Sequence, residues 1–351
     1  MNRNRPVILA LLVLAGNVLA QNNLMNRDTP VAPIQPTEMH GFTNVLRLRN
    51  SRLDVVITPS VGRVTALLFK DRNNMLHLND DALRRKASGE PLDGWQNYGG
   101  DWFWPVAQER WTEVAGRNWP PPAFLADDTW QGHAWLGADG TRHALLQRTY
   151  GEPLFLKATR HFMLEPDRPV VTVMQSLERT AESKVPVTLW NISQVRQVAS
   201  AALPVDPDSR FPKGYGVLAF TEPPSELVTA CDASVIVNVG AGTEHKLGSD
   251  SKRAWIAGER EGVVLLERAR TEAVGTYPDQ DSRVTLYSNT GLGYTEMETL
   301  SPEMLLKPGE RLENVLTMEL FDVSDMKDCN LSDAVRMRIG EKAVTSSQPV
   351  R

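Results

Sequence analysis

Residues 53–69 read LDVVITPSVGRVTALLF, which divides into two apolar runs at residues 53–58 and 64–69. Both runs are rich in valine, isoleucine, leucine and threonine, residue types that pack well on a pleated sheet. Pro59 ends the first run, because proline cannot donate a hydrogen bond within a sheet, and Gly62 supplies a turn before the second. The segment therefore predicts two strands joined by a short turn.

Runs of the same kind recur along the chain, separated by turn residues. They cover residues 44–50, 144–150, 154–164, 170–177, 185–195, 235–239, 262–268, 284–289, 294–300 and 311–320. Helical periodicity is confined to residues 80–86 and 332–339. Many short strands with few helices are typical of antiparallel sheets packed as a sandwich or barrel. We therefore predict an all-β fold.

The first twenty residues are typical of an export signal peptide. Arg3 and Arg5 give a positive start, an apolar run covers residues 7–14, and residues 18–20 suit cleavage. Residues 21–41 are polar and carry prolines, which predicts a flexible leader. The globular body is expected at residues 42–323, followed by a C-terminal tail at 324–351. We expect a secreted protein, periplasmic if the source is a Gram-negative bacterium, with no lipid or membrane anchor.

Composition is that of a globular protein and limits the possible partners. Hydrophobic residues make up 41%, charged residues 23%, and the formal net charge is −5. A negative balance disfavours nucleic acid, because phosphate binding requires a basic surface. Cys231 and Cys329 have no histidine or cysteine at metal-ligand spacing, so we predict no metal site and no cofactor. Export permits a disulfide between them, but sequence alone leaves this pairing and the oligomeric state open.

Seven of the nine tryptophans fall between Trp95 and Trp135. An aromatic face offers apolar area while its N–H edge still forms hydrogen bonds, which suits a ligand composed of C–H and hydroxyl groups. The alternative is that these rings only fill the core of a sandwich. Glycines, prolines and charges interrupt the cluster as they do in loops, so the cluster as a whole favours a sugar-binding surface.

Residues 294–302 read YTEMETLSP and place two glutamates on one strand. Side chains alternate along a strand, so Tyr294, Glu296, Glu298 and Leu300 share one face. The two carboxylates are then about 7 Å apart. If both point into a cleft, repulsion and burial raise one pKa and favour a division into acid and base. The alternative is an ordinary solvated strand face.

Several segments, taken in order, resemble the aldose 1-epimerase (galactose mutarotase)-like superfamily. Residues 53–64 resemble its opening hairpin, and Tyr98-Gly99-Gly100 occupies the place of a His-Gly-Gly turn. Residues 187–193 resemble the strand that carries a second histidine, and residues 294–302 resemble the late strand with the catalytic glutamate. Residues 306–310 resemble the turn into the last strand. The resemblance covers residues 42–323 and implies a large antiparallel β-supersandwich with few short helices.

The family's chemistry implies roles for particular residues. In true mutarotases a glutamate takes the proton of the anomeric hydroxyl while a histidine protonates the ring oxygen. By position Glu298 fits the base, with Glu296 as the near alternative. The sequence departs at both histidines, with Tyr98 at the first and Trp190 or Asn191 at the second. Asp101 is a candidate replacement acid, or it caps the turn after Gly100.

Further residues are candidates for ligand contacts. Trp104, Gln108 and Trp119 follow the double glycine, and the proline run after Trp119 favours a rigid platform. Lys246 suits an anionic substituent on a sugar, although most lone lysines are solvated. Asp279 suits a sugar hydroxyl, although Asp after proline more often belongs to a turn.

These features predict an exported carbohydrate-binding protein, with an epimerase-type activity that uses an altered acid. A non-catalytic glycan-recognition module is the alternative from another class. A glycosidase fits less well, because two carboxylates on one strand lie on the same side of a bound sugar, whereas acid and nucleophile flank the scissile bond. We expect the double-glycine turn, the mid-chain tryptophan strand and the late acidic strand to converge on one hollow.

Overall fold

The computed structural model describes residues 30–70, 72–126, 129–239, 243–271, 273–324 and 329–341. The predicted export signal and the start of the predicted leader lie outside these ranges, as does the end of the tail. Within the described residues, no helix has the length and apolar character needed to cross a bilayer.

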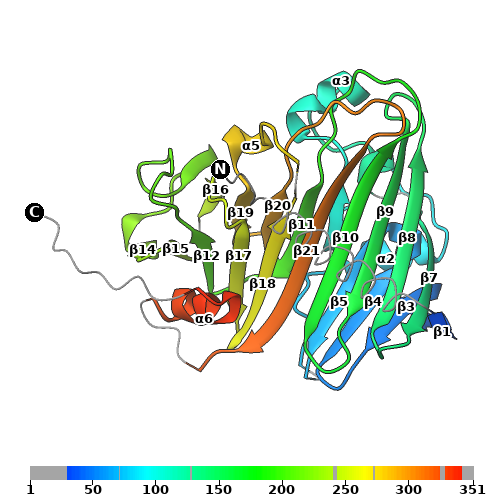
Figure 1. Ribbon diagram of the computed structural model, residues 1–351, viewed down its shortest axis with the longest axis horizontal. Helices are drawn as coiled ribbons and strands as arrows, with labels where there is room; N and C mark the ends of the chain where they lie inside the picture. The colour runs from blue at the N-terminus through cyan, green and yellow to red at the C-terminus, as the bar shows by residue number, and fades with distance from the viewer. Residues whose placement is uncertain are drawn as a thin grey trace, which may run out of the picture.

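Two large sheets account for most of the described chain (Figure 1). The first has eleven strands, in the order β1 (Pro30–Ile34), β7 (Gln131–Gly137), β8 (Arg142–Tyr150), β9 (Leu156–Leu164), β10 (Val170–Arg179), β21 (Arg311–Asp322), β18 (Val263–Arg270), β17 (Trp255–Arg260), β12 (Ser200–Pro204), β15 (Ser234–Asn238) and β14 (Val228–Cys231). The second has ten, in the order β13 (Gly216–Phe220), β16 (Glu244–Ser249), β19 (Val284–Asn289), β20 (Tyr294–Leu300), β11 (Trp190–Arg196), β6 (Gly100–Trp104), β5 (Arg63–Phe69), β4 (Leu53–Thr58), β3 (Phe42–Arg49) and β2 (Thr37–Met39).

The opening hairpin forms as predicted. β4 and β5 pair antiparallel, joined by the 3₁₀ turn η1 (Pro59–Val61), and Gly62 ends that turn with φ of 65°. A left-handed φ of this kind costs glycine little, because it lacks a Cβ atom. β4, β19 and β20 have the bounds that the sequence predicted. The predicted all-β sandwich is thereby confirmed.

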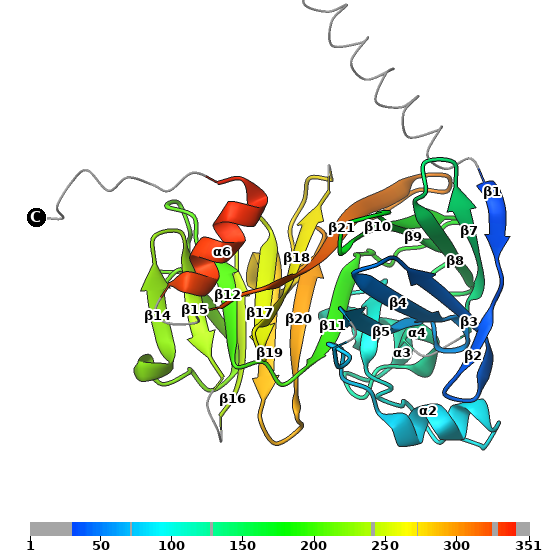
Figure 2. The same ribbon diagram turned by 90° about the horizontal axis from the view of Figure 1, so that it is seen from below.

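The main core lies between the two sheets, because each sheet turns one row of apolar side chains towards the other. Val55 and Met297 from the ten-stranded sheet and Val173 and Leu316 from the eleven-stranded sheet are fully buried in this single cluster. Figure 2 shows the two layers from another side, with α2 (Asp80–Ala87) lying below β3 and β4. The helix covers a smaller apolar cluster on the outer face there.

The predicted helices are confirmed with small changes in their bounds. Residues 80–86 lie in α2, and residues 332–339 lie in α6 (Asn330–Ile339). Shorter helices are α3 (Trp111–Ala115), α4 (Ala123–Ala126), α5 (Pro278–Asp281), η2 (Gln108–Arg110) and η3 (Ser225–Leu227).

α6 packs on the outer face of the eleven-stranded sheet, where Leu331 and Val335 meet Trp255 and Phe321 (Figure 2). A disulfide between Cys231 and Cys329 joins the start of this helix to β14. The pairing that the sequence left open is therefore formed, and it fastens the C-terminal segment to the body.

The sequence prediction was wrong at two places. Residues 30–39, assigned to a flexible leader, form β1 and β2, which pair with β7 and β3. Residues 100–104, interpreted as part of a loop because glycine precedes the tryptophans, form the central strand β6. In both cases the local sequence favours extended structure only weakly, and the strand forms because it pairs with a neighbouring strand.

Candidate functional site

The strands that carry the predicted motifs lie side by side. β11 lies between β20 and β6, so Ile192 of β11 is flanked by Glu298 on one side and Trp102 on the other. Trp190 of β11 lies opposite Trp104 of β6. β19 and β16 continue the sheet beyond β20. The three motifs therefore meet in one sheet.

The double glycine brings β6 into this sheet. Gly99 and Gly100 have φ of 77° and 80°, a region that other residues rarely adopt. A Cβ atom at Gly99 would lie 2.2 Å from the carbonyl oxygen of His77, and one at Gly100 would lie 2.4 Å from that of Val64. The two glycines are thus required for close backbone contacts with neighbouring segments.

A cavity of about 450 Å³ lies on the outer face of the ten-stranded sheet. Its lining combines aromatic rings with a few charged groups. It consists of Trp95, Trp102, Trp104, Gln108, Trp119, Phe220, Glu244, Lys246, Tyr287, Leu292, Tyr294, Glu296 and Glu298. A large, largely aromatic hollow with a few convergent polar groups is the usual form of a small-molecule site.

Six of the residues selected from the sequence line this cavity. They are Trp104, Gln108, Trp119, Lys246, Glu296 and Glu298. Tyr294, Glu296 and Glu298 face it from alternate positions of β20, while Met297 between them is buried in the core. The predicted alternation along this strand is confirmed.

Glu298 is held by donors from three strands. Its Oε2 atom accepts hydrogen bonds from the indole N–H of Trp190 at 2.8 Å and from the hydroxyl of Thr285. The ammonium of Lys246 lies 3.5 Å from the same oxygen. Because these contacts all fall on Oε2, Oε1 is the atom suited to accept a hydrogen bond from a ligand.

Glu296 lies in a different environment on the same strand. Its Oε1 atom accepts a hydrogen bond from the side-chain amide of Gln194 at 2.7 Å. Burial, together with the nearby charge of Glu298, raises the pKa of Glu296 to about 7. A substantial fraction of this carboxyl group is therefore protonated at neutral pH.

Lys246 is already paired with two carboxylates. Its ammonium lies 2.6 Å from Asp279 and 3.5 Å from Glu298. Burial alone would lower the pKa of Lys246, but Glu298 and Asp279 outweigh burial and raise it. The lysine thus serves as a counter-ion within the site.

Asp279 reaches Lys246 from α5, a strained turn in which Asp279, Gln280 and Asp281 all have positive φ. Positive φ angles at three consecutive non-glycine residues cost conformational free energy. Backbone conformations of this kind cluster at functional sites. The backbone N–H of Asp279 donates to Glu109 at 3.1 Å, which ties α5 to η2. Figure 1 shows α5 and α3, the helix directly after η2, at the same end of the molecule.

The rim of the cavity is aromatic on both sides. Trp119 is 57% exposed, and its ring lies 5.3 Å from that of Trp95 and stacks at 6.1 Å on buried Trp111. On the other side Phe220 is 59% exposed and contacts the ring of Tyr287. Large exposed aromatic rings that face a shared hollow are suited to contact a ligand.

Asp101 and Asn191 do not belong to this site, contrary to the expectation from sequence. Both side chains are fully buried on the opposite face of the sheet. Asp101 forms an ion pair with Arg160 of β9 at 2.5 Å and accepts hydrogen bonds from Asn191 and Ser193. Side chains alternate along a strand, so Asp101 points to the opposite face from Trp102, and Asn191 points to the opposite face from Trp190. They connect the two sheets and cannot reach a ligand in the cavity.

Tyr98 and Trp190 lie near the cavity without lining it. Tyr98 is buried beneath α2, and the guanidinium of Arg63 lies between its ring and that of Trp102, 5.6 Å and 3.9 Å from the two centroids. Trp190 has no exposed surface and supports Glu298 from behind. Both are therefore supporting residues.

Sequence reasoning missed several lining residues. Trp95, Trp102, Phe220, Glu244, Tyr287 and Leu292 were not selected as ligand contacts. Trp102 could have been found, because it has the same strand parity as Trp104. Phe220, Glu244 and Tyr287 lie on strands whose place in the sheet depends on long-range pairing, and Trp95 and Leu292 lie outside the strands.

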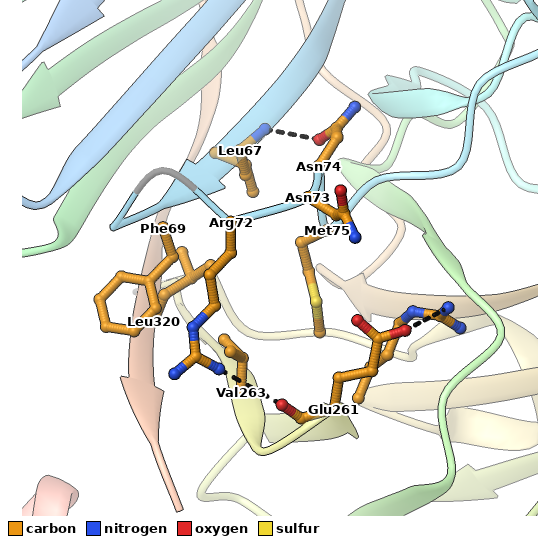
Figure 3. A pocket seen from close by; sticks show the side chains of 10 residues that line it. Leu67, Phe69, Arg72, Asn73, Asn74, Met75, Glu261, Val263 and Leu320 are labelled. Atoms are coloured by element: carbon orange, nitrogen blue, oxygen red, sulfur yellow. Dashed lines mark hydrogen bonds and ion pairs between the residues drawn. The ribbon is translucent and has the colours of Figure 1, made fainter.

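A second, smaller cavity of about 230 Å³ lies between β5 and β18 (Figure 3). Its cations are engaged within the protein: Arg72 pairs with Asp322 at 2.9 Å, and Arg260 pairs with Glu261 at 2.7 Å. Neither arginine is therefore available to bind an anionic ligand in this cavity. Among the described residues, no group of three or more histidine, cysteine or acidic side chains is arranged to hold a metal ion.

Comparison with known proteins identifies the architecture. No family model matches the chain, and no curated protein matches its sequence. Solved structures do match. A protein from Synechocystis sp. PCC 6803 aligns with a TM-score of 0.58 at 11% identity, over 84% of this chain and 99% of that one.

Two further structures carry the family's name. A galactose mutarotase-like protein from Lactobacillus casei aligns with a TM-score of 0.51 at 12% identity, over 79% of this chain and all of that one. A candidate aldose 1-epimerase from Escherichia coli K12 aligns with a TM-score of 0.51 at 10% identity, over 80% and 99% of the two chains. At this level of identity the likeness shows the fold alone. The chain has the galactose mutarotase-like fold.

Proposed function

We propose that the protein is an exported carbohydrate-binding protein and that its aromatic cavity carries an epimerase-type activity on the anomeric centre of a free sugar. The observation that carries the proposal is the position of Glu298 and Glu296 at the floor of a cavity rimmed by Trp95 and Trp119. Aromatic faces contact the C–H surface of a sugar, and carboxylates accept its hydroxyl protons.

Glu298 and Glu296 divide the chemistry between them. Glu298 takes the proton of the anomeric hydroxyl, with Trp190 and Lys246 stabilising its Oε2. Glu296, with its pKa of about 7, gives a proton to the ring oxygen, so the ring opens and closes on either face. The anomeric hydroxyl oxygen and the ring oxygen are both bonded to the anomeric carbon. Glu298 and Glu296, on one strand, can therefore reach the two oxygens from the same side of the sugar.

A glycan-recognition module without catalysis is the second candidate. No histidine is among the described residues that line the cavity, and the family's acid is a histidine. This observation favours binding alone if Glu296 cannot act as the acid.

Magnetisation exchange between the α and β anomers of an aldose, followed by NMR, tests the enzymatic proposal. Wild-type protein should accelerate exchange, Glu298→Gln should abolish the acceleration, and Glu296→Gln should reduce it. Exposed Glu226→Gln is the matched control and should leave exchange unchanged. No acceleration by the wild type on any aldose, with binding retained, would contradict catalysis and favour the module.

A further inference from the structure

The charged groups of the cavity are unevenly balanced. Three lining side chains are carboxylates, namely Glu244, Glu296 and Glu298, and one lining residue, Lys246, is a cation. Asp279 adds a fourth carboxylate against that lysine. Arg63 lies behind Trp102, where its guanidinium donates to the backbone carbonyl of Gly99. The cavity therefore has a surplus of negative charge.

Lys246 cannot serve as the receptor for an anionic sugar substituent. Its ammonium is held between Asp279 and Glu298, and its side chain is only 12% exposed. A carboxylate or phosphate on the ligand would have to displace one of these partners and would lie close to the other acidic groups. Like charges in a partly buried site repel strongly, because the local dielectric is low.

Glu244 and Glu296 differ from Glu298, because their hydrogen-bond partners are neutral. Glu244 accepts from the hydroxyl of Tyr287 at 2.8 Å, and Glu296 accepts from the amide of Gln194. The two carboxylates flank Tyr287: this tyrosine lies directly opposite Glu296 in the sheet and is one strand from Glu244. They form an acidic end of the cavity; Lys246 lies directly opposite Tyr287 in the sheet, but it is held by Asp279 and Glu298.

Aromatic rings surround this acidic end. Tyr287 and Tyr294 lie beside the carboxylates, and Phe220 packs against Tyr287 at 5.6 Å. Aromatic faces attract ammonium groups through their quadrupole, and aromatic cages that include carboxylates are suited to recognise organic cations. An acidic, aromatic end next to a sugar site points to a ligand that is both a saccharide and a cation.

We infer that the cavity takes an amino sugar with a free, protonated amine, whose ammonium lies beside Glu244 and the ring of Tyr287. This inference rests on the proposed function, since it names the class of saccharide for the same site.

Titration calorimetry with four monosaccharides tests it: glucosamine, N-acetylglucosamine, glucose and glucuronate. At about pH 7 the free amine is largely protonated, whereas the acetylated amine carries no charge. Glucosamine should bind about tenfold more tightly than glucose or N-acetylglucosamine, and glucuronate should bind most weakly. The preference for glucosamine should shrink as salt is added, because ions screen the attraction.

The variant Glu244→Gln tests whether the acidic end of the cavity causes the preference for glucosamine over glucose. It should bring the ratio of glucosamine to glucose affinity close to one, while exposed Glu226→Gln should leave the ratio at the wild-type value. Equal affinity of the wild type for glucosamine and glucose, or tighter binding of glucuronate, would overturn the amino-sugar inference and leave the proposed function standing. Absence of binding by all four sugars would overturn both.

Discussion

The indole N–H of Trp190 donates a hydrogen bond of 2.8 Å to Oε2 of Glu298, and neither residue is more than 2% exposed. The resemblance noted in the sequence places Trp190 or Asn191 where the mutarotase pattern has its second histidine. The position of Trp190 behind the glutamate fixes the carboxylate without offering a proton to the ligand. Trp190 therefore orients Glu298, and in the proposed reaction the acid is Glu296.

Trp190→Phe should weaken catalysis more than folding. The phenyl ring retains most of the buried surface but loses the donor to a charged acceptor, a loss of about 1.5–3 kcal/mol. Anomer exchange should therefore slow about tenfold or more. NMR exchange rates and thermal unfolding of the same preparation provide the measurement. Trp255→Phe, in the buried core of the other sheet, is the control, and an equal effect of both variants on exchange would rule out the orienting role.

Trp119→Ala should weaken saccharide binding with little effect on stability. The ring is 57% exposed, so its removal leaves no large internal cavity. Loss of one stacked aromatic ring should reduce the free energy of saccharide binding by about 0.5–1.5 kcal/mol, in addition to the loss from the smaller buried area. Calorimetry gives the affinity. Trp135→Ala, on the outer face of the other sheet, is the matched control; unchanged binding in Trp119→Ala would remove this ring from the site.

Lys246→Met should destabilise the fold strongly. The substitution leaves Asp279 and Glu298 close together and partly buried without their shared cation, a change that costs about 3–5 kcal/mol. Asp279→Asn in the same chain should recover part of this loss, because it removes one of the two charges. Denaturant unfolding of both single variants and the double variant measures the coupling. Additive effects would show that the ion pair contributes nothing, and exposed Lys184→Met should be neutral.

A buried carboxyl group in the inter-sheet core should make stability depend on pH. Burial, together with the charge of Asp101, raises the pKa of Glu267 to about 8 from an ordinary value of 4.5. The folded state then holds a proton that the unfolded state releases. The stabilisation is complete below about pH 4.5, falls as pH rises, and is fully lost above about pH 8.

Glu267→Gln should abolish this part of the pH dependence. At about pH 8.5 the variant should be more stable than the wild type by the order of a few kcal/mol, and near pH 4 the difference should vanish. Unfolding midpoints across this range, with exposed Glu313→Gln as control, test the prediction. A constant difference between variant and wild type at all pH values would contradict it.

The sequence predicted the site better along strands than between them. Alternation on β20 was sufficient to place Glu296 and Glu298 on one face, because a strand has a fixed period of two. The same rule, applied to β6 and β11, would have turned Asp101 and Asn191 away from the ligand. The segment around Trp102 was interpreted as a loop, and on the strand predicted over residues 185–195 the resemblance left Trp190 and Asn191 as equal candidates.

Other parts of the site depend on contacts between distant segments. Glu244 and Tyr287 come together only because β16 and β19 pair, and no local pattern specifies that pairing. Asp279 reaches Lys246 only through the positive φ angles of α5, which its sequence does not require. A lysine expected to receive an anionic substituent thus has its counter-ions within the protein.

A crystal structure of the protein soaked with a monosaccharide tests the central claim most directly. The account predicts density for one sugar ring within the cavity, with a hydroxyl within hydrogen-bond distance of Oε1 of Glu298 and a ring face against an aromatic side chain of the rim. Density for the sugar at another surface, or an unoccupied cavity at a saturating sugar concentration, would contradict it.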